Sequence, residues 1–296
     1  MQVPALFDYR RAASVDEALS MLEQGGEEAR LLAGGHSLLP MMRLRLATPE
    51  TLIDVNDLTE LDYLRLEGDT LAIGALTRHA TLLDSPLLAE HYRIFAEAER
   101  VIADPLVRNR GTIGGSLCQA DPAEDLTAVC CALRAEAVIR SSSGIRTLPV
   151  RELDLGPYQT AVQPAEMLTE VRIPVRPGSG SAYAKVHRRA GDWAIAAAGA
   201  FVRMDGDTIV DVGIGLAALG APGMTCPEVE QGLIGGPGTP EAFDAAARGV
   251  AESVDPPTDQ RGPADYKRHL AGELTRRVLN RAVARASVVP SQRGEH

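Results

Sequence analysis

The spacing of apolar residues at the start of the chain predicts a small α/β unit over residues 1–57. Ser14 and Glu17 form a capping box, which predicts a helix through the apolar positions that follow, and Gly25-Gly26 ends it. Apolar spacing then predicts a strand, a helix and a second strand, at 29–33, 37–46 and 51–55.

Residues 58–176 are predicted to form a second unit that mixes helices with strands. Strands are expected at 70–74, 137–140, 145–148 and 170–174, the middle two as a hairpin. Helices are expected at 77–83 and 126–133, with a long, mostly helical stretch at 87–102 between them. Thr77 and Asp125 are the expected N-caps of the first and last of these helices, and Asp104-Pro105 ends the long one.

The segment from Arg176 to Ser181 is rich in Gly, Ser and Pro, which is typical of a linker. The third unit, 177–288, is predicted to contain antiparallel strands at 182–188, 194–204 and 208–217. Helices are expected at 227–233, 240–252 and 263–286, followed by a polar tail at 289–296. Antiparallel strands and separate helices together predict an α+β fold.

Composition limits the classes of function that this chain can have. The 296 residues suffice for two or three domains, and 45% hydrophobic with 24% charged residues is ordinary for a soluble protein. The formal net charge of −10 argues against a nucleic-acid or anionic-membrane partner. Because we find neither a signal segment nor an apolar run of about 18 residues, we expect a cytoplasmic protein without an integral membrane segment.

The cysteine pattern favours ordinary buried thiols. The four cysteines form no C-x-x-C pair, and two of them are adjacent (Cys118, Cys130, Cys131 and Cys226). This spacing argues against a disulfide framework, a metal site or an iron–sulfur cluster held by this chain alone.

Two glycine pairs are the strongest candidate binding elements. Gly34-Gly35 follows an apolar strand, and Gly114-Gly115 follows Gly111-Thr112-Ile113. Glycine permits sharp bends and close approach to a ligand, and consecutive backbone N–H groups in such a bend bind anions. Neither pair fits the triphosphate loop or the Rossmann fingerprint. Two such loops are therefore predicted to be two walls around a diphosphate.

Carboxylates and a histidine near these loops have several interpretations. Asp121 and Asp125 are suited to acid–base work, to a helix cap in a solvated loop, or to hydrogen bonds with ligand hydroxyls such as those of a ribose or ribityl chain. Beside a phosphate loop we favour the last. His36 is either a polar rim residue or a hydrogen-bonding partner of the ligand.

Trp193, the only tryptophan, follows Asp192 and several charged residues. It is either a core residue or a flat surface on which a ring such as an isoalloxazine stacks. Lys185, eight residues earlier on a predicted strand, could place a cation near that ring or near its phosphates.

These motifs together resemble the flavoprotein (medium, FAD-binding) subunits of molybdenum hydroxylases, above all those of the aerobic carbon monoxide dehydrogenase type. The resemblance covers nearly the whole chain. It is carried by Ala33-Gly34-Gly35-His36-Ser37-Leu38-Leu39-Pro40-Met41-Met42, Ile102-Ala103-Asp104-Pro105, Gly111-Thr112-Ile113-Gly114-Gly115, Asp121-Pro122-Ala123-Glu124-Asp125, Glu170-Val171-Arg172-Ile173-Pro174, Gly191-Asp192-Trp193-Ala194 and Arg261-Gly262-Pro263-Ala264-Asp265-Tyr266-Lys267.

The resemblance implies a two-part FAD-binding domain of the vanillyl-alcohol-oxidase type followed by an antiparallel sheet with helices. It also implies a set of FAD contacts. They are Leu31, Leu32, Ala33, Gly34, Gly35, His36, Ser37, Leu38, Ile102, Thr112, Ile113, Gly114, Gly115, Ser116, Asp121, Asp125, Leu168, Lys185, Asp192 and Trp193. Trp193 stands where close relatives tend to have Tyr, and Ser116 where many have Asn.

The function that the resemblance implies is electron transfer without catalytic side chains or a metal in this chain. A large subunit would carry molybdenum on molybdopterin cytosine dinucleotide, and a small subunit would carry [2Fe–2S] clusters that reduce the FAD. A dimer of heterotrimers is the family expectation, peripheral at most to the inner face of the membrane. The alternatives are a stand-alone FAD-dependent oxidase or reductase, a structural subunit with a dispensable flavin, or a flavin subunit that serves an N-heterocycle, purine or aldehyde hydroxylase.

Overall fold

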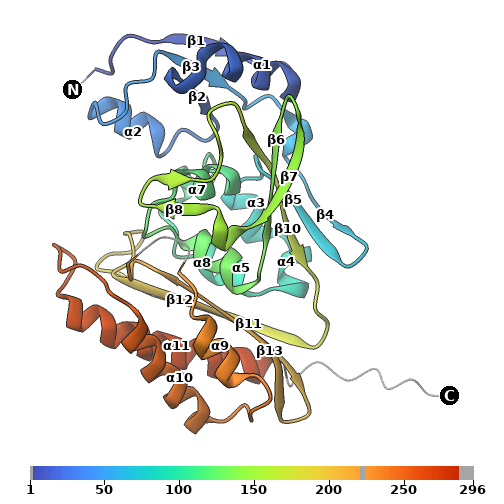
Figure 1. Ribbon diagram of the computed structural model, residues 1–296, viewed down its shortest axis with the longest axis vertical. Helices are drawn as coiled ribbons and strands as arrows, with labels where there is room; N and C mark the ends of the chain where they lie inside the picture. Colours follow the sequence, from blue (N-terminus) through green and yellow to red (C-terminus); the bar gives the residue numbers. More distant parts are fainter. Residues whose placement is uncertain (1–2, 221–223, 287–296) are drawn as a thin grey trace.

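The three larger β-sheets follow one another along the long axis of the molecule (Figure 1). This computed structural model describes residues 3–220 and 224–286, so the predicted tail at 289–296 lies outside the described residues. The N-terminal sheet lies at one end, a five-stranded sheet in the middle and a three-stranded sheet with its helices at the other end. The predicted α+β class is confirmed.

The N-terminal sheet is parallel, in the order β1-β3-β2. Its strands are β1 (Asp8–Arg11), β2 (Ala29–Leu32) and β3 (Thr51–Asp54). Helix α1 (Val15–Gly25) buries Ala18, Leu19 and Leu22, and the Ser14 hydroxyl accepts from the Glu17 N–H at 3.1 Å, as the capping box predicts. A short turn, η1 (Gly26–Glu28), and helix α2 (Leu38–Arg43) complete the unit. Strand β1 escaped prediction because its four residues are polar and exposed.

The middle sheet is antiparallel, in the order β4-β5-β10-β6-β7. Its strands are β4 (Leu64–Glu67), β5 (Thr70–Gly74), β6 (Glu136–Ser141), β7 (Gly144–Pro149) and β10 (Met167–Pro174). The predicted hairpin is the β6–β7 pair. A two-stranded ribbon, β8 (Asp154–Gly156) and β9 (Gln159–Thr160), and the short turns η2 (Thr59–Leu61) and η3 (Val150–Glu152) lie beside it.

Six short helices accompany the middle sheet. They are α3 (His79–Asp84), α4 (Pro86–His91), α5 (Ile94–Glu99), α6 (Pro105–Arg108), α7 (Ile113–Gln119) and α8 (Asp125–Ala132). The stretch 87–102 is mostly helical, as predicted, and is divided between α4 and α5. The chain leaves α4 at the buried Tyr92, whose hydroxyl donates to the Pro174 carbonyl at 2.6 Å. The prediction that Thr77 caps α3 is wrong, because the Thr77 hydroxyl donates to the Tyr63 carbonyl at 2.8 Å.

The C-terminal sheet is antiparallel and lies between two layers of helix. Strands β11 (Ser179–Val186), β12 (Ala196–Asp205) and β13 (Thr208–Ala217) are followed by α9 (Pro227–Leu233), α10 (Pro240–Ser253) and α11 (Ala264–Ala286). Helices α10 and α11 cover the outer face, and α8 packs on the face toward the middle sheet (Figure 1). An ideal Cβ on Gly215 would lie 1.9 Å from the Ala128 carbonyl oxygen, so glycine lets the backbone of α8 approach β13 closely.

Candidate functional site

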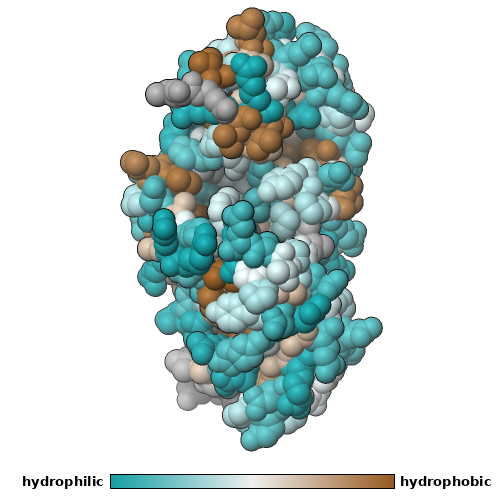
Figure 2. Space-filling view, turned by 90° about the vertical axis from the view of Figure 1, so that its left-hand side faces the viewer, coloured by the Kyte–Doolittle hydropathy of each residue, from teal (hydrophilic) through white to brown (hydrophobic). Residues whose placement is uncertain are grey.

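A cavity of about 1020 Å³ opens between the N-terminal sheet, α7 and the start of the C-terminal sheet. This volume lies at the upper end of the range for ligand sites in proteins. Exposed apolar residues are concentrated in the upper half of the face in Figure 2, whereas the lower half, over the C-terminal unit, is mostly polar. The same face carries α2 in Figure 1.

The first glycine pair forms an open bend between β2 and α2. Gly35 has φ = 76°, a conformation that favours glycine. Within the described part of the chain, the backbone N–H groups of Gly34, Gly35, His36 and Ser37 have no hydrogen-bond acceptor. Four successive free N–H groups at a cavity wall are the arrangement that binds an anion.

His36 stabilises this bend from within. Its Nδ1 lies 2.9 Å from the Gly34 carbonyl oxygen, and the residue also lines the cavity. The imidazole of His36 therefore has a hydrogen-bond partner in the loop itself.

The second glycine pair lies in the first turn of α7, so the prediction of a second loop is wrong. The Thr112 hydroxyl caps the helix by accepting from the Gly115 N–H at 3.1 Å, and the Gly114 N–H donates to the Ala75 carbonyl at 2.9 Å. An ideal Cβ on Gly114 would lie 2.7 Å from the Ala75 oxygen. The pair thus lets α7 pack against the end of β5, and its N–H groups are used inside the protein.

The two glycine segments touch each other. An ideal Cβ on Gly34 would lie 2.4 Å from the Arg110 carbonyl oxygen and 2.7 Å from the Gly111 Cα. Arg78 donates to the same Arg110 carbonyl and, at 2.8 Å, to the Asn56 side-chain oxygen. Asn56 in turn donates to the Ala33 carbonyl at 2.7 Å.

Asn56 and Arg78 therefore hold the two glycine segments together as one wall. Neither residue was predicted from the sequence. Their partners are 22 to 32 positions away along the chain, and neither stands in a recognisable motif.

Asp125 lies in a buried ion pair rather than at a helix cap. Its Oδ2 lies 2.7 Å from Lys185 Nζ, its other oxygen accepts from the Tyr183 hydroxyl, and the Asp125 and Lys185 side chains are only 5% and 2% exposed. Burial raises the pKa of Asp125, and the Lys185 ammonium opposes that rise. Glu124, not Asp125, is the N-cap residue of α8, so that prediction is wrong.

Asp121 has a structural role at this position in the chain. Its carboxylate accepts from the Ala123 N–H at 2.9 Å and from the Tyr158 hydroxyl at 3.0 Å, and it does not line the cavity. Of the two aspartates expected to bind ligand hydroxyls, only Asp125 reaches the cavity.

Trp193 is a cavity residue and not a core residue. It is 41% exposed, and its backbone N–H donates to the Asp192 side chain at 2.9 Å. The preceding Gly191 has φ = 74° and lies so close to Ala103 that a Cβ would be 2.6 Å from the Ala103 carbonyl oxygen. This contact fixes the loop that carries the indole.

Most of the residues singled out in the sequence share this cavity. Ile113 is fully buried beneath it, and Asp121 lies outside it. The lining includes Leu31, Leu32, Ala33, Gly34, Gly35, His36, Ser37, Leu38, Ile102, Thr112, Gly114, Gly115, Ser116, Asp125, Leu168, Lys185, Asp192 and Trp193.

A buried chain of polar side chains at the cavity wall was not predicted. His79 Nδ1 lies 3.0 Å and 3.1 Å from the two carboxylate oxygens of Glu99, and its Nε2 lies 3.1 Å from the Ser116 hydroxyl. Ser116 also hydrogen-bonds Glu124. His79, Ser116 and Glu124 all line the cavity, and none of the four is more than 9% exposed.

Burial and neighbouring charges set the pKa values of these buried polar side chains. Burial lowers the pKa of His79, but the Glu99 carboxylate outweighs that effect, so the net shift is upward. Burial raises the pKa of Glu124 to about 7, with the charge of Asp125 acting in the same direction and that of His79 against it. Glu124 is therefore a buried acid that titrates near neutrality.

Residues 3–220 and 224–286 hold no cluster of three or more His, Cys, Asp or Glu side chains suited to a metal ion. No helix among them is both long and apolar enough to cross a membrane.

Comparison with protein families gives two matches that together span the chain. Residues 5–176 match the FAD binding domain in molybdopterin dehydrogenase, and residues 181–282 match the CO dehydrogenase flavoprotein C-terminal domain.

Individual relatives match over their full length. The carbon monoxide dehydrogenase medium chain of Hydrogenophaga pseudoflava is 42% identical over 96% of this chain and 100% of its own. The glyceraldehyde dehydrogenase medium chain of Sulfolobus acidocaldarius is 36% identical over 93% of this chain and 98% of its own.

Solved structures agree with this relationship. The carbon monoxide dehydrogenase of Hydrogenophaga pseudoflava, in a form that lacks the Mo-pyranopterin moiety of its molybdenum cofactor, superposes with a TM-score of 0.93 at 42% identity. The match covers 95% of this chain and 99% of that one. The fold agrees with that of a solved relative, and both family domains follow in order. The chain therefore belongs to the FAD-binding flavoprotein subunits of the molybdopterin dehydrogenases, close to the carbon monoxide dehydrogenase medium chains.

Proposed function

We propose that the cavity holds FAD, with its pyrophosphate on the free N–H groups of Gly34 to Ser37. This cluster of unpaired donors is the observation that carries the proposal, because an anion is the partner that satisfies it. The chemistry of the cavity fits the rest of the cofactor. Trp193 offers a flat exposed surface for a ring, and Asp125 and Lys185 supply a charged pair at the wall.

The residues predicted from the family resemblance become contacts in this proposal with two adjustments. Ile113 supports α7 from beneath, and Asp121 fixes the loop before α8, so both act behind the surface that the cofactor would touch. Gly114 and Gly115 shape the wall rather than donate hydrogen bonds to the pyrophosphate.

The proposed function is electron transfer within a molybdenum hydroxylase of the carbon monoxide dehydrogenase type. FAD, when bound, supplies the redox chemistry, accepting electrons and passing them to an external acceptor. The protein's own residues bind the pyrophosphate, orient the ring and keep the buried charges paired. Electrons would come from [2Fe–2S] clusters in a small partner subunit.

Substrate oxidation is assigned to a large partner subunit that carries molybdenum on molybdopterin cytosine dinucleotide. Relatives of this chain serve complexes named for carbon monoxide, glyceraldehyde and nicotine, at 42%, 36% and 36% identity. Since such similar flavin subunits accompany different substrates, substrate choice belongs to the large subunit. We propose a dimer of heterotrimers in the cytoplasm.

The proposed domain division follows the sheets. Residues 1–57 and 58–176 would form the two parts of the FAD domain, and 177–288 the C-terminal domain. Each of these ranges contains one of the three main sheets.

The test is purification of the native complex through a tag on this chain. We expect a flavin spectrum together with molybdenum, iron and two co-purifying chains. Flavin with neither metal nor partner chains, and turnover by the isolated chain, would instead identify a stand-alone oxidase or reductase. A complete complex that keeps its electron transfer after flavin removal would identify a structural subunit.

A further inference from the structure

Among the residues that the structure describes, Glu124 is the one acidic residue of the cavity wall that is buried and has no ion-pair partner. Glu124 is only 7% exposed. The ion pairs among the described residues join two basic groups of the cavity wall to other carboxylates, Lys185 to Asp125 and His79 to Glu99. Burying an unpaired carboxylate costs more free energy than burying the protonated acid.

Polar and charged groups from several elements influence Glu124. His79 of α3 approaches through Ser116 of α7, and Glu99 of α5 stands behind His79. Asp121 in the preceding loop and Asp125 of α8 add negative charge, the latter largely balanced by Lys185 of β11. This environment holds the pKa of Glu124 at about 7, so the residue is ready to gain or lose a proton near neutral pH.

We propose that Glu124 is the redox-linked proton acceptor of the cavity: it takes up one proton from solvent when electrons enter the bound cofactor. The proton ends on a carboxylate oxygen of Glu124, the electrons stay on the cofactor, and no other bond forms. Ser116 is a positioning residue, because its hydroxyl links the Glu124 carboxylate to the His79–Glu99 pair. The inference rests on the proposed binding of FAD in this cavity.

The reason is electrostatic. Added negative charge in a poorly solvated cavity favours the neutral form of a nearby acid and raises its pKa. Well below its pKa in the oxidised state Glu124 is protonated in both redox states, and well above its pKa in the reduced state it is ionised in both. Proton uptake therefore occurs only between its pKa values in the two states, and linkage makes the reduction potential fall as pH rises across that window.

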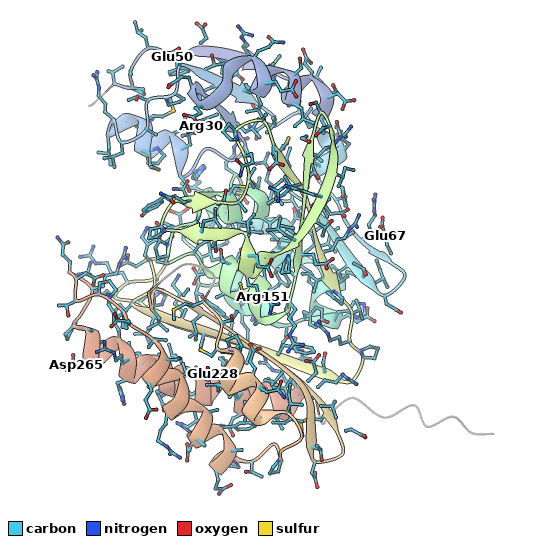
Figure 3. All side chains as sticks on the ribbon, viewed as in Figure 1. Arg30, Glu50, Glu67, Arg151, Glu228 and Asp265 are labelled. Atoms are coloured by element: carbon cyan, nitrogen blue, oxygen red, sulfur yellow. The ribbon has the colours of Figure 1, made fainter. Side chains whose placement is uncertain are left out.

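The experiment is a spectroelectrochemical titration of the flavin in the purified complex, for wild type, Glu124→Gln and Glu228→Gln. Glu228 is an exposed residue on α9, among the C-terminal helices, and serves as the control (Figure 3). The wild-type potential is expected to fall by up to about 30 mV more per pH unit than that of Glu124→Gln within the window, the value for one proton per two electrons. The two should coincide at low pH, and the variant should have the higher potential at high pH, whereas Glu228→Gln follows wild type.

If the reduction potentials of wild type and Glu124→Gln depend on pH in parallel at all pH values, the proposal is overturned. A flavin spectrum in the same sample would leave the proposed function intact. Absence of flavin from the wild-type complex would refute the proposed function instead. If Glu124→Gln loses its flavin, Ser116→Ala decides. Losing the Ser116 hydrogen bond to the carboxylate should move the window to higher pH, and an unchanged profile would refute the proposal.

Discussion

Replacing Gly34 with alanine tests the contact between the two glycine segments. The new Cβ would lie 2.4 Å from the Arg110 carbonyl oxygen, whereas real Cβ atoms essentially never come within 3.0 Å of a neighbour. The segments must therefore separate by at least 0.6 Å, the difference between these two distances. Both sides of the contact are backbone, so no side-chain rotation relieves it.

Overpacking of this kind costs about 1–3 kcal/mol, or about 5- to 150-fold in an equilibrium constant. Because the clash sits where the free N–H groups begin, we expect FAD affinity to fall in that range and the unfolding temperature to decrease. Calorimetric titration of flavin-depleted chain with FAD measures the first, and thermal unfolding the second.

Gly232→Ala is the matched control. Nothing lies within 4 Å of an ideal Cβ there, and the residue is in α9, where alanine is favoured by about 0.5–1 kcal/mol. The control should bind FAD normally and be no less stable than wild type. An FAD affinity of Gly34→Ala within twofold of wild type, with an unchanged unfolding temperature, would show that the two segments do not form a fixed wall.

Three other substitutions test separate parts of the site. Asn56→Ala removes the donor to Ala33 and the acceptor for Arg78, and should cost about 1–3 kcal/mol of unfolding free energy in urea together with weaker FAD binding; unaffected binding would separate this link from the site. Asp125→Asn leaves the Lys185 ammonium buried without its carboxylate and should lower the unfolding free energy by about 3–5 kcal/mol. Adding Lys185→Met, which removes the ammonium charge, should restore part of this loss in a double-mutant cycle. Strictly additive effects of the two substitutions would contradict an ion pair. Asp154→Asn addresses a carboxylate whose buried oxygens have no hydrogen-bond partner and whose pKa burial raises to about 7. A folded-state pKa above the unfolded value means that the wild-type chain loses stability as pH rises from about 4 to about 7. The unfolding free energy of Asp154→Asn should therefore match that of wild type near pH 4 and exceed it at pH 8 by on the order of 1–2 kcal/mol, after allowance for solvent screening. Equal unfolding curves of the two proteins at both pH values would contradict this.

Elements that bury a regular apolar pattern were predictable from sequence. Strand β5 and strand β13 begin and end where the pattern predicts, as does α9, because each combines apolar spacing with a clear start or stop signal. Helix α7 was missed for the opposite reason. It is seven residues long and contains Gly114 and Gly115, and glycine is a poor helix former, so its helical form depends on tertiary contacts, among them those with Ala75 and Thr112.

Several residues of the cavity wall were predictable from the sequence, whereas their side-chain partners were not. The glycine pairs, Lys185 and Trp193 were found because unusual residue types stand at unusual places. Which groups pair with one another depends on contacts between distant segments. The Lys185 bond to Asp125 joins residues 60 positions apart, and His79 meets Glu99 and Ser116 across 20 and 37 positions. No local pattern encodes those partners.

The C-terminal sheet determines how far α8 projects toward the cavity, although most of that sheet lies away from it. Gly213 and Gly215 of β13 would place a Cβ within 2.0 Å and 1.9 Å of carbonyl oxygens on α8, so any side chain there would displace the helix. Glu124 and Asp125 stand at the start of α8, and Lys185 reaches Asp125 from β11 of the same sheet. The close packing of α8 on this sheet therefore sets the relative positions of the buried acid, the ion pair and the cavity. This accounts for a cavity whose wall residues come from all three units: the N-terminal bend supplies the free N–H groups, the middle unit supplies α7 and His79, and the C-terminal sheet holds the Asp125–Lys185 pair.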